Sequence, residues 1–359
     1  MTILDQNYFD LALLILSSLF VGFIVTPVSI WFAKKLDIID YPGRTTHQIH
    51  KKPTPRAGGI AIMLSLLIMI LLNQLWDHAE ILWVFIPAGV IFSFGLWDDK
   101  HGMDAPTKFI GQLLAVTILI FFDVRVKFLE NQSFFIQLNG TLAYWTDILI
   151  TYFWVVGITN AFNMVDSMDG LAIGLCQIIS AFFLFLSMVS GQSSLAYFSA
   201  IIFGISFSAA FYNRRPAKMF LGDSGAQSLG FMLAAAAIIY HPKAFSQTSS
   251  WFSPIMFFSV PIFDTSLVTI SRLLRGLPFY KANLDHTYHR LVALGWDQNR
   301  AVAIMQIGGV VFGLVSICVV YLPPFIANVI FAIWIIVFMV LIYLLEKTFT
   351  AYNPDKKNS

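Results

Sequence analysis

The composition of the chain is that of a membrane protein. Of its 359 residues, 58% are hydrophobic and only 12% are charged, and the formal net charge at pH 7 is +2. A soluble globular domain is about 45–50% apolar and about 25% charged, so this composition excludes an ordinary soluble protein. The small net charge gives no sign of a nucleic-acid partner. Cys176 and Cys318 lie inside apolar runs and are expected to be buried, unpaired thiols.

Apolar runs of about 20 residues recur along the sequence and predict transmembrane helices. Eleven spans are expected, at 9–32, 57–74, 80–97, 106–123, 144–162, 170–190, 194–212, 225–241, 251–273, 301–322 and 325–345. The N-terminus has neither a basic n-region nor a small-residue cleavage site, so the first span is expected to be the targeting signal. The predicted fold is an all-α polytopic membrane protein that forms one domain over residues 1–359.

Positive charges predict the orientation of the spans. Of the 22 Lys and Arg residues, all except Arg125, Lys127 and Lys243 fall on connections of one side. Cytoplasmic connections are rich in Lys and Arg, so the N-terminus is expected outside and the C-terminus in the cytoplasm. The outer connection 125–142 alternates partly and contains an Asn-Gly turn signal. These features favour a short β-hairpin, with an irregular loop as the alternative.

The first two cytoplasmic connections bring charged side chains to the membrane surface. The first is basic and carries His47 and His50. A cytoplasmic anchor explains its charge, whereas a flap facing an anion would also explain the histidines. The second begins with Asp98 and Asp99 and continues to Lys108. Adjacent helical residues point about 100° apart, so one carboxylate is expected to face a cation while the other takes a proton or holds a lysine. A solvated helix end is the alternative.

The third connection carries amides and carboxylates at regular spacing. In NAFNMVDSMDGLA (160–172), the residues Asn160, Asn163, Asp166 and Asp169 follow one another at intervals of three. On a helix this spacing places them on one face. Oxygen ligands of this kind suit Mg²⁺ or Mn²⁺ rather than zinc. The alternative is that Asp166 caps the next span, which leaves the other polar groups unexplained.

The fourth connection ends in a glycine-rich turn around an aspartate. Asp223 lies between Gly222 and Gly225, immediately before the eighth span. Glycines let backbone N–H groups approach an anion, and a helix N-terminus favours negative charge. An aspartate there would repel a bare phosphate, so a cation between the two is expected, with an N-cap role as the alternative. Phe220 is expected either to stack on a ligand or to anchor the chain at the membrane interface.

The fifth connection and the span before it carry the remaining polar groups. Asp285, His286, His289 and Arg290 cluster within six residues. An arginine beside two histidines favours a diphosphate clamp. Zinc would need a third ligand, and a solvated amphipathic helix would need none. Asp264 lies inside the ninth span, where a carboxylate is expected to be functional or paired.

Four of these motifs together resemble one family, the polyprenyl-phosphate N-acetylhexosamine-1-phosphate transferases. Asp98-Asp99, 160–172, 220–230 (FLGDSGAQSLG) and 285–291 (DHTYHRL) follow one another in the family's order, each on a cytoplasmic connection. The chain is most similar to the bacterial branch that transfers GlcNAc-1-phosphate from UDP-GlcNAc to undecaprenyl phosphate. It is less similar to the phospho-MurNAc-pentapeptide branch, which has ten spans and three consecutive histidines where this chain has His-Thr-Tyr-His.

The resemblance implies roles for the candidate residues. The implied metal ligands, for Mg²⁺ or Mn²⁺, are Asn163 and Asp223. The implied catalytic residues are Asp98, Asp99, Asp166, Asp169, His286 and His289. The implied substrate-binding residues are Lys108, Asn160, Asp169, Phe220 and Arg290. In this scheme Phe220 stacks on uracil, and Asp98 or Asp99 deprotonates the lipid phosphate.

The implied reaction joins a UDP-sugar to undecaprenyl phosphate with release of UMP. The resemblance places it at the cytoplasmic face of a bacterial inner membrane, and homodimers are common in the family. Two other classes remain open from the residues alone. A cation-coupled transporter would bury carboxylates near the bilayer midplane and often shows inverted repeats. A non-catalytic scaffold would not need these amides and carboxylates in combination.

Overall fold

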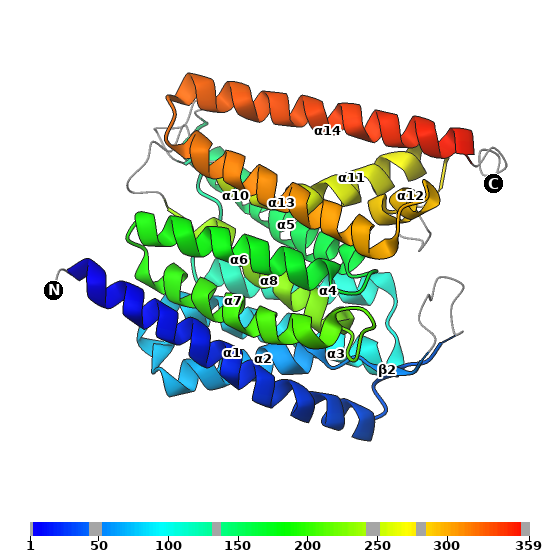
Figure 1. Ribbon diagram of the computed structural model, residues 1–359. Coiled ribbons are helices and arrows are strands. Elements are labelled where there is room, and N and C mark those ends of the chain that lie inside the picture. The colour runs from blue at the N-terminus through cyan, green and yellow to red at the C-terminus, as the bar shows by residue number, and fades with distance from the viewer. Residues whose placement is uncertain (1–2, 43–51, 131–137, 242–251, 278–284, 353–359) are drawn as a thin grey trace. The chain divides into compact units, whose positions relative to one another are not determined.

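The fold is built almost entirely of α-helices (Figure 1). A computed structural model describes residues 3–42, 52–130, 138–241, 252–277 and 285–352. The helices are α1 (Ile3–Lys35), α2 (Gly58–Leu72), α3 (Ala79–His101), α4 (Ala105–Phe121), α5 (Gly140–Val165), α6 (Leu171–Val189), α7 (Ser193–Asn213), α8 (Gly222–Ile239), α10 (Ser253–Phe257), α11 (Ser259–Leu274), α12 (Thr287–Ala293), α13 (Gln298–Val320) and α14 (Pro324–Tyr352). A 3-10 turn, η1, spans Leu75–Asp77, and β1 (Ile39–Asp40) pairs antiparallel with β2 (Thr54–Pro55).

The predicted all-α membrane fold is confirmed. Among the described residues, seven helices are long and apolar enough to cross a membrane, and α2 and α4 are shorter apolar helices. Each expected span coincides with a helix, except that the ninth, 251–273, is broken at Phe258 between α10 and α11. Pro261 has no N–H to bond the carbonyl of Phe257, so a continuous helix would lack one backbone hydrogen bond at this break. The number of crossings and their orientation stay predictions.

Two further expectations fall at least partly outside the described residues. His47 and His50 of the expected flap lie outside them. The outer hairpin expected at 125–142 includes 131–137, which also lie outside them, and the described residues of that connection form no strand.

The chain forms two compact units, Met1–Thr248 and Ser249–Ser359. The expectation of one domain stays a prediction, because two compact units can belong to one membrane domain. In the first unit α8 is the central helix: it packs against α2, α3, α5 and α6, and Ser224–Ile238 are all buried. Glycine permits this close packing, since a Cβ on Gly230 would lie 2.7 Å from the Cβ of Phe162.

The second unit has its own aromatic core. Phe252, Phe263, Trp334 and Phe338 are buried together in it, and the indole of Trp334 donates a hydrogen bond to the hydroxyl of Ser259 at 3.0 Å. The short helix α12, which carries the histidines, packs against α11 and α13.

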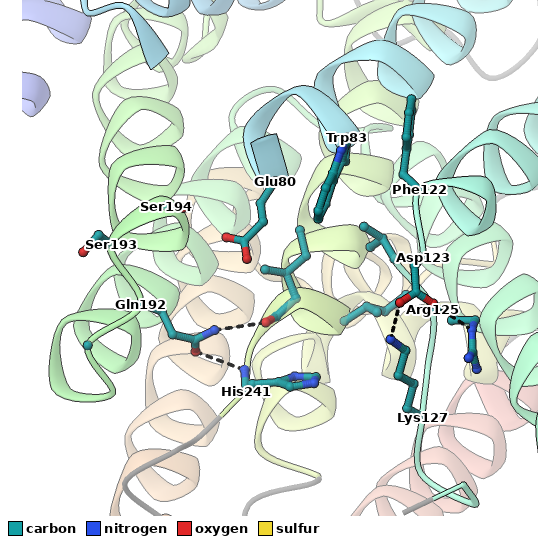
Figure 2. A pocket seen from close by; sticks show the side chains of 14 residues that line it. Glu80, Trp83, Phe122, Asp123, Arg125, Lys127, Gln192, Ser193, Ser194 and His241 are labelled. Atoms are coloured by element: carbon teal, nitrogen blue, oxygen red, sulfur yellow. Dashed lines mark hydrogen bonds and ion pairs between the residues drawn. The ribbon is translucent and has the colours of Figure 1, made fainter. Parts of the chain in front are cut away.

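A polar cavity of about 440 Å³ marks one end of the first unit. Figure 2 shows Lys127 bonded to Asp123, and Gln192 holding the backbone at the end of α8. Glu80, near the start of α3, lines the same cavity. Asp98 lies 18 residues further along α3, a rise of about 27 Å. The cavity and the carboxylates of α3 therefore lie near opposite ends of this helix.

Candidate active site

Asp99 joins the end of α3 to the start of α8. Its carboxylate accepts hydrogen bonds from the backbone N–H of Asp223 (2.8 Å) and from the N–H and hydroxyl of Ser224 (3.1 and 2.6 Å). These N–H groups belong to the first turn of α8, which has no side-chain cap of its own. Gly222 makes the approach feasible, because its φ is +69° and a Cβ there would lie 2.5 Å from Asp99 Oδ2. Asp99 therefore caps α8 from another helix.

Lys108 lies between two carboxylates. Its Nζ is 2.6 Å from Oδ2 of Asp98 and 2.6 Å from Oδ2 of Asp223. Asp98 is only 8% exposed, whereas the side chain of Asp223 is 22% exposed. The amide of Asn163 lies 3.5 Å from the same oxygen of Asp223. The predicted pair of metal ligands therefore lies side by side, and an ammonium group occupies the position of a cation between the carboxylates.

A chain of buried amides supports Asp223 from behind. Gln112 donates to the side-chain oxygens of Asn160 (3.1 Å) and Gln227 (2.9 Å). Asn160 donates back to Gln112 (2.8 Å), and Gln227 donates to Oδ2 of Asp223 (3.1 Å). Asn160 was predicted to bind substrate. Its geometry instead favours a role in orienting the carboxylate through its neighbours.

The helix predicted through residues 160–172 does not continue beyond Val165. The helix α5 ends at Val165, and a turn leads to Gly170, whose φ of +81° starts α6. Asp166 and Asp169 thus lie in this turn and do not share a helical face with the amides. The side chain of Asp169 accepts a hydrogen bond from the backbone N–H of Ala217 at 3.3 Å. This contact joins the turn to the connection that precedes α8.

Asp166, in this turn, lies near three other carboxylates. Loss of solvation raises the pKa of the Asp166 carboxyl well above its ordinary value, and the negative charges of Asp223, Asp99 and Asp169 raise it further. Burial is the main cause of this shift, and the three neighbouring carboxylates add negative charge to the site. A divalent cation would offset that charge.

The connection before α8 is clamped to the segment before α2. The N–H of Phe220 donates to the carbonyl of Pro55 (2.9 Å), and the N–H of Gly58 donates to the carbonyl of Phe220 (3.0 Å). Arg56 lies between these contacts, with Nη2 2.9 Å from Asp40 and Nη1 3.7 Å from Asp99. The ring of Phe220 is half-buried. It is therefore fixed by backbone bonds on both sides and still reachable by a ligand.

The histidine cluster belongs to the second unit. His286 precedes α12, and its Nδ1 lies 2.8 Å from Oδ2 of Asp264. This contact supplies the partner of Asp264 that the sequence could not name. His289 lies on α12 with its ring 5.9 Å from that of His286.

Arg290 is held by partners inside the second unit. Its guanidinium donates to Glu346 (2.6 Å), to the hydroxyl of Ser271 (2.7 Å) and to the carbonyl of Asp285 (3.0 Å). The residue is 1% exposed. The predicted clamp on a diphosphate is not supported by this geometry, because the donors are already engaged and buried. A structural role fits better.

The structure joins predicted and unpredicted residues. Contacts in the first unit connect most of the predicted residues: Asp98, Asp99, Lys108, Asn160, Asn163 and Asp223. The predicted residues of the second unit are His286, His289 and Arg290. Residues that the sequence analysis did not single out are Arg56, Gln112, Ser224 and Gln227. Uncharged amides and a serine do not stand out in the sequence as candidate site residues. Arg56 was considered only as one of the positive charges that predict the orientation of the spans.

Comparison with known proteins identifies the family. The profile of glycosyl transferase family 4 matches residues 81–241, a stretch that contains Asp98, Lys108, Asn163 and Asp223. A decaprenyl-phosphate N-acetylglucosaminephosphotransferase of Mycobacterium tuberculosis is 31% identical, and the match covers 96% of this chain and 92% of that protein. The chain belongs to glycosyl transferase family 4. The resemblance seen in the sequence is confirmed, and the protein is a transferase and an integral multi-pass membrane protein.

Other relatives of the family carry two kinds of name. A probable undecaprenyl-phosphate N-acetylglucosaminyl 1-phosphate transferase of Bacillus subtilis is 29% identical, over 88% of this chain and 86% of its own length. A phospho-N-acetylmuramoyl-pentapeptide-transferase of Staphylococcus aureus is 28% identical, over 84% of this chain and 97% of its own length. The family matches therefore include both branches considered from the sequence.

Proposed function

We propose that the protein transfers a sugar-1-phosphate, most specifically GlcNAc-1-phosphate, from a UDP-sugar to undecaprenyl phosphate and releases UMP. The observation that carries the proposal is the cluster of Asp98, Lys108, Asn163 and Asp223 in a member of glycosyl transferase family 4. The names of the mycobacterial and Bacillus relatives support the sugar and the polyprenyl acceptor.

The proposed cofactor is Mg²⁺, and Mn²⁺ suits the same donors. Asn163 and Asp223 would hold it, because each side chain offers an oxygen ligand and the two lie close together. Nδ2 of Asn163 is 3.5 Å from Oδ2 of Asp223. Among the described residues no three His, Cys, Asp or Glu side chains are grouped for a metal ion. When bound, the ion would neutralise charge on the diphosphate and on the leaving UMP.

The proposed chemistry is an attack of one phosphate on another. An oxygen of undecaprenyl phosphate forms a bond to the β-phosphorus of the UDP-sugar, while the bond from that phosphorus to UMP breaks and UMP leaves with the electron pair. Positioning and charge neutralisation supply most of the catalysis in phosphoryl transfer. A phosphate monoester has a second pKa of about 6, so the acceptor is already largely dianionic at neutral pH. Asp98 would therefore serve to place Lys108 more than to remove a proton.

The neighbouring side chains would recognise the substrates. Lys108, now shared by two carboxylates, would act as a point charge on a phosphate oxygen. Phe220 would stack on uracil, and Asp169 would line the nucleotide pocket from the adjoining turn. The family resemblance implies that His286 and His289 bind the diphosphate, and this role stays a prediction.

The proposed location is the bacterial cytoplasmic membrane, with the site on the cytoplasmic side. A polyprenyl tail stays in the bilayer while the UDP-sugar arrives from water, so the site must open at the interface. The carboxylates of α3 support this location, since α3 is long and apolar enough to cross a membrane and Asp98 and Asp99 lie near its end. A homodimer stays a prediction.

A panel of donors tests the proposal. The purified protein in detergent receives undecaprenyl phosphate and Mg²⁺ together with UDP-GlcNAc, UDP-GalNAc or UDP-MurNAc-pentapeptide. UMP release and the mass of the lipid product are measured, and Asp223→Asn serves as the inactive control. We expect product from UDP-GlcNAc. Product from the pentapeptide donor alone would move the protein to the other branch, which the Staphylococcus relative represents. Absence of UMP with every donor would refute the proposal and favour a transporter.

A further inference from the structure

Asp264 is a fully buried carboxylate with two partners. Its side chain is 0% exposed in the middle of α11. Oδ2 lies 2.8 Å from Nδ1 of His286, and Oδ1 accepts a hydrogen bond from the backbone N–H of Thr287 at 2.6 Å. A buried carboxylate needs such partners, and both its oxygens are engaged. The carboxylate is therefore fixed in place before any ligand arrives.

The contact with Asp264 determines which nitrogen of His286 carries the proton. An ionised carboxylate only accepts hydrogen bonds, so Nδ1 must be the donor. The remaining ring nitrogen, Nε2, then holds the lone pair in the neutral imidazole. The carboxylate also stabilises the imidazolium that forms when Nε2 takes a proton.

The surroundings hold the imidazole in one orientation. Its ring is stacked on that of Tyr288, with centroids 5.7 Å apart and planes at 11°. His286 is 7% exposed, so one edge of it reaches the surface. In the part of the chain that the structure describes, the only hydrogen bond of the ring is the one through Nδ1. Nε2 is thus the nitrogen that is left for a ligand.

We propose that Asp264 is the positioning residue of His286: it fixes the tautomer in which Nε2 keeps its lone pair and accepts a hydrogen bond or a proton from a ligand. The inference rests on the proposed function for the identity of that ligand. It goes beyond the proposed function in assigning a buried carboxylate of α11 to the reaction. Asp264 acts through the histidine and does not itself touch substrate.

A purely structural role makes different predictions. The hydrogen bond from the N–H of Thr287 shows that Asp264 also caps the start of α12. Loss of this cap alone would lower the stability of the protein, whichever ring nitrogen of His286 carries the proton. Asn at position 264 separates the two roles. Its oxygen can still accept from Thr287, but its NH₂ group donates to Nδ1 and so selects the opposite tautomer.

The experiment compares four variants of the full chain: Asp264→Asn, His286→Gln, the double substitution, and Asp297→Asn. Asp297 is the matched control, because its carboxylate caps α13 through the N–H of Asn299 at 3.0 Å and no histidine contacts it. We expect Asp264→Asn to lower kcat about 10–100-fold with little change in KM. We expect the double variant to be no slower than His286→Gln alone, and the control to keep wild-type turnover.

Nitrogen NMR of ¹⁵N-histidine-labelled protein provides a readout that does not depend on activity. The His286 signals are assigned as those missing from His286→Gln. The wild type should carry its proton on Nδ1, and Asp264→Asn should carry it on Nε2. A wild-type Nε2–H tautomer, or additive losses of turnover in the double variant, would overturn the inference. Absence of UMP release by the wild type would refute the proposed function instead, and the NMR result would still decide the tautomer.

Discussion

The Asp99→Asn substitution tests whether this carboxylate holds the start of α8 in place. Asparagine can keep its oxygen on the two donors of Ser224, but its NH₂ group then points at the N–H of Asp223, which Oδ1 now accepts at 2.8 Å. A hydrogen bond to a charged group contributes about 1.5–3 kcal/mol. A carboxylate at a helix N-terminus adds about 0.3–1 kcal/mol. The free energy of unfolding should therefore fall by about 2–4 kcal/mol.

Thermal unfolding of the purified protein in detergent and EDTA measures this loss. With about 2 °C per kcal/mol for a chain of this size, Asp99→Asn should lower Tm by roughly 4–8 °C. Asp98→Asn is the matched control: it removes a neighbouring carboxylate that bonds Lys108 and no backbone N–H of α8, so its Tm should fall less. A Tm for Asp99→Asn equal to that of the wild type, or above that of Asp98→Asn, would refute the assignment of Asp99 as a cap.

Three other substitutions test neighbouring parts of the structure. Lys108→Met leaves two carboxylates without their shared cation, so Tm should fall in EDTA and the gap to wild type should narrow with Mg²⁺; a gap that Mg²⁺ does not change would contradict this. Gly222→Ala places a Cβ 2.5 Å from Asp99 at a φ of +69°, so turnover and Tm should both fall, and wild-type values would show that the turn adapts. Arg290→Met removes the guanidinium that is paired with Glu346, so Tm should fall while KM for the UDP-sugar stays constant; a raised KM at unchanged Tm would restore the predicted clamp.

The helical fold was predictable because a bilayer imposes one rule on every span. Each span must be apolar and satisfy its own backbone, so long apolar runs map directly onto helices. The break at Phe258 was harder to predict, since a proline inside an apolar run either kinks a helix or restarts it. The central position of α8 had a signal that went unused: glycines and the run Ala234–Ala237 suit a helix that is packed on all sides.

The charged members of the site were predictable, but their contacts were not. Carboxylates in an apolar sequence stand out, but the contacts of Asp223 with Asp99 and with Lys108 each span more than 100 residues. Gln112 and Gln227 are uncharged and their contact spans 115 residues, so neither stood out. The turn that contains Asp166 did have a signal in the sequence, namely Gly170. Glycine is the residue that most readily adopts a positive φ, and Gly170 adopts one at the end of this turn.

The balance of charge explains why such a site would take a cation together with its substrate. The carboxylates of the cluster are Asp98, Asp99, Asp166, Asp169 and Asp223. Among the described residues, Lys108 and Arg56 form ion pairs with carboxylates of this cluster. A diphosphate entering this cluster alone would meet net negative charge in a partly desolvated place, where repulsion is strong. A divalent ion that enters with the diphosphate cancels charge on both sides, and it also frees Lys108 to move from carboxylate to phosphate. In the proposed reaction, the acidic residues that would exclude a bare anion would thus favour a metal-bound one.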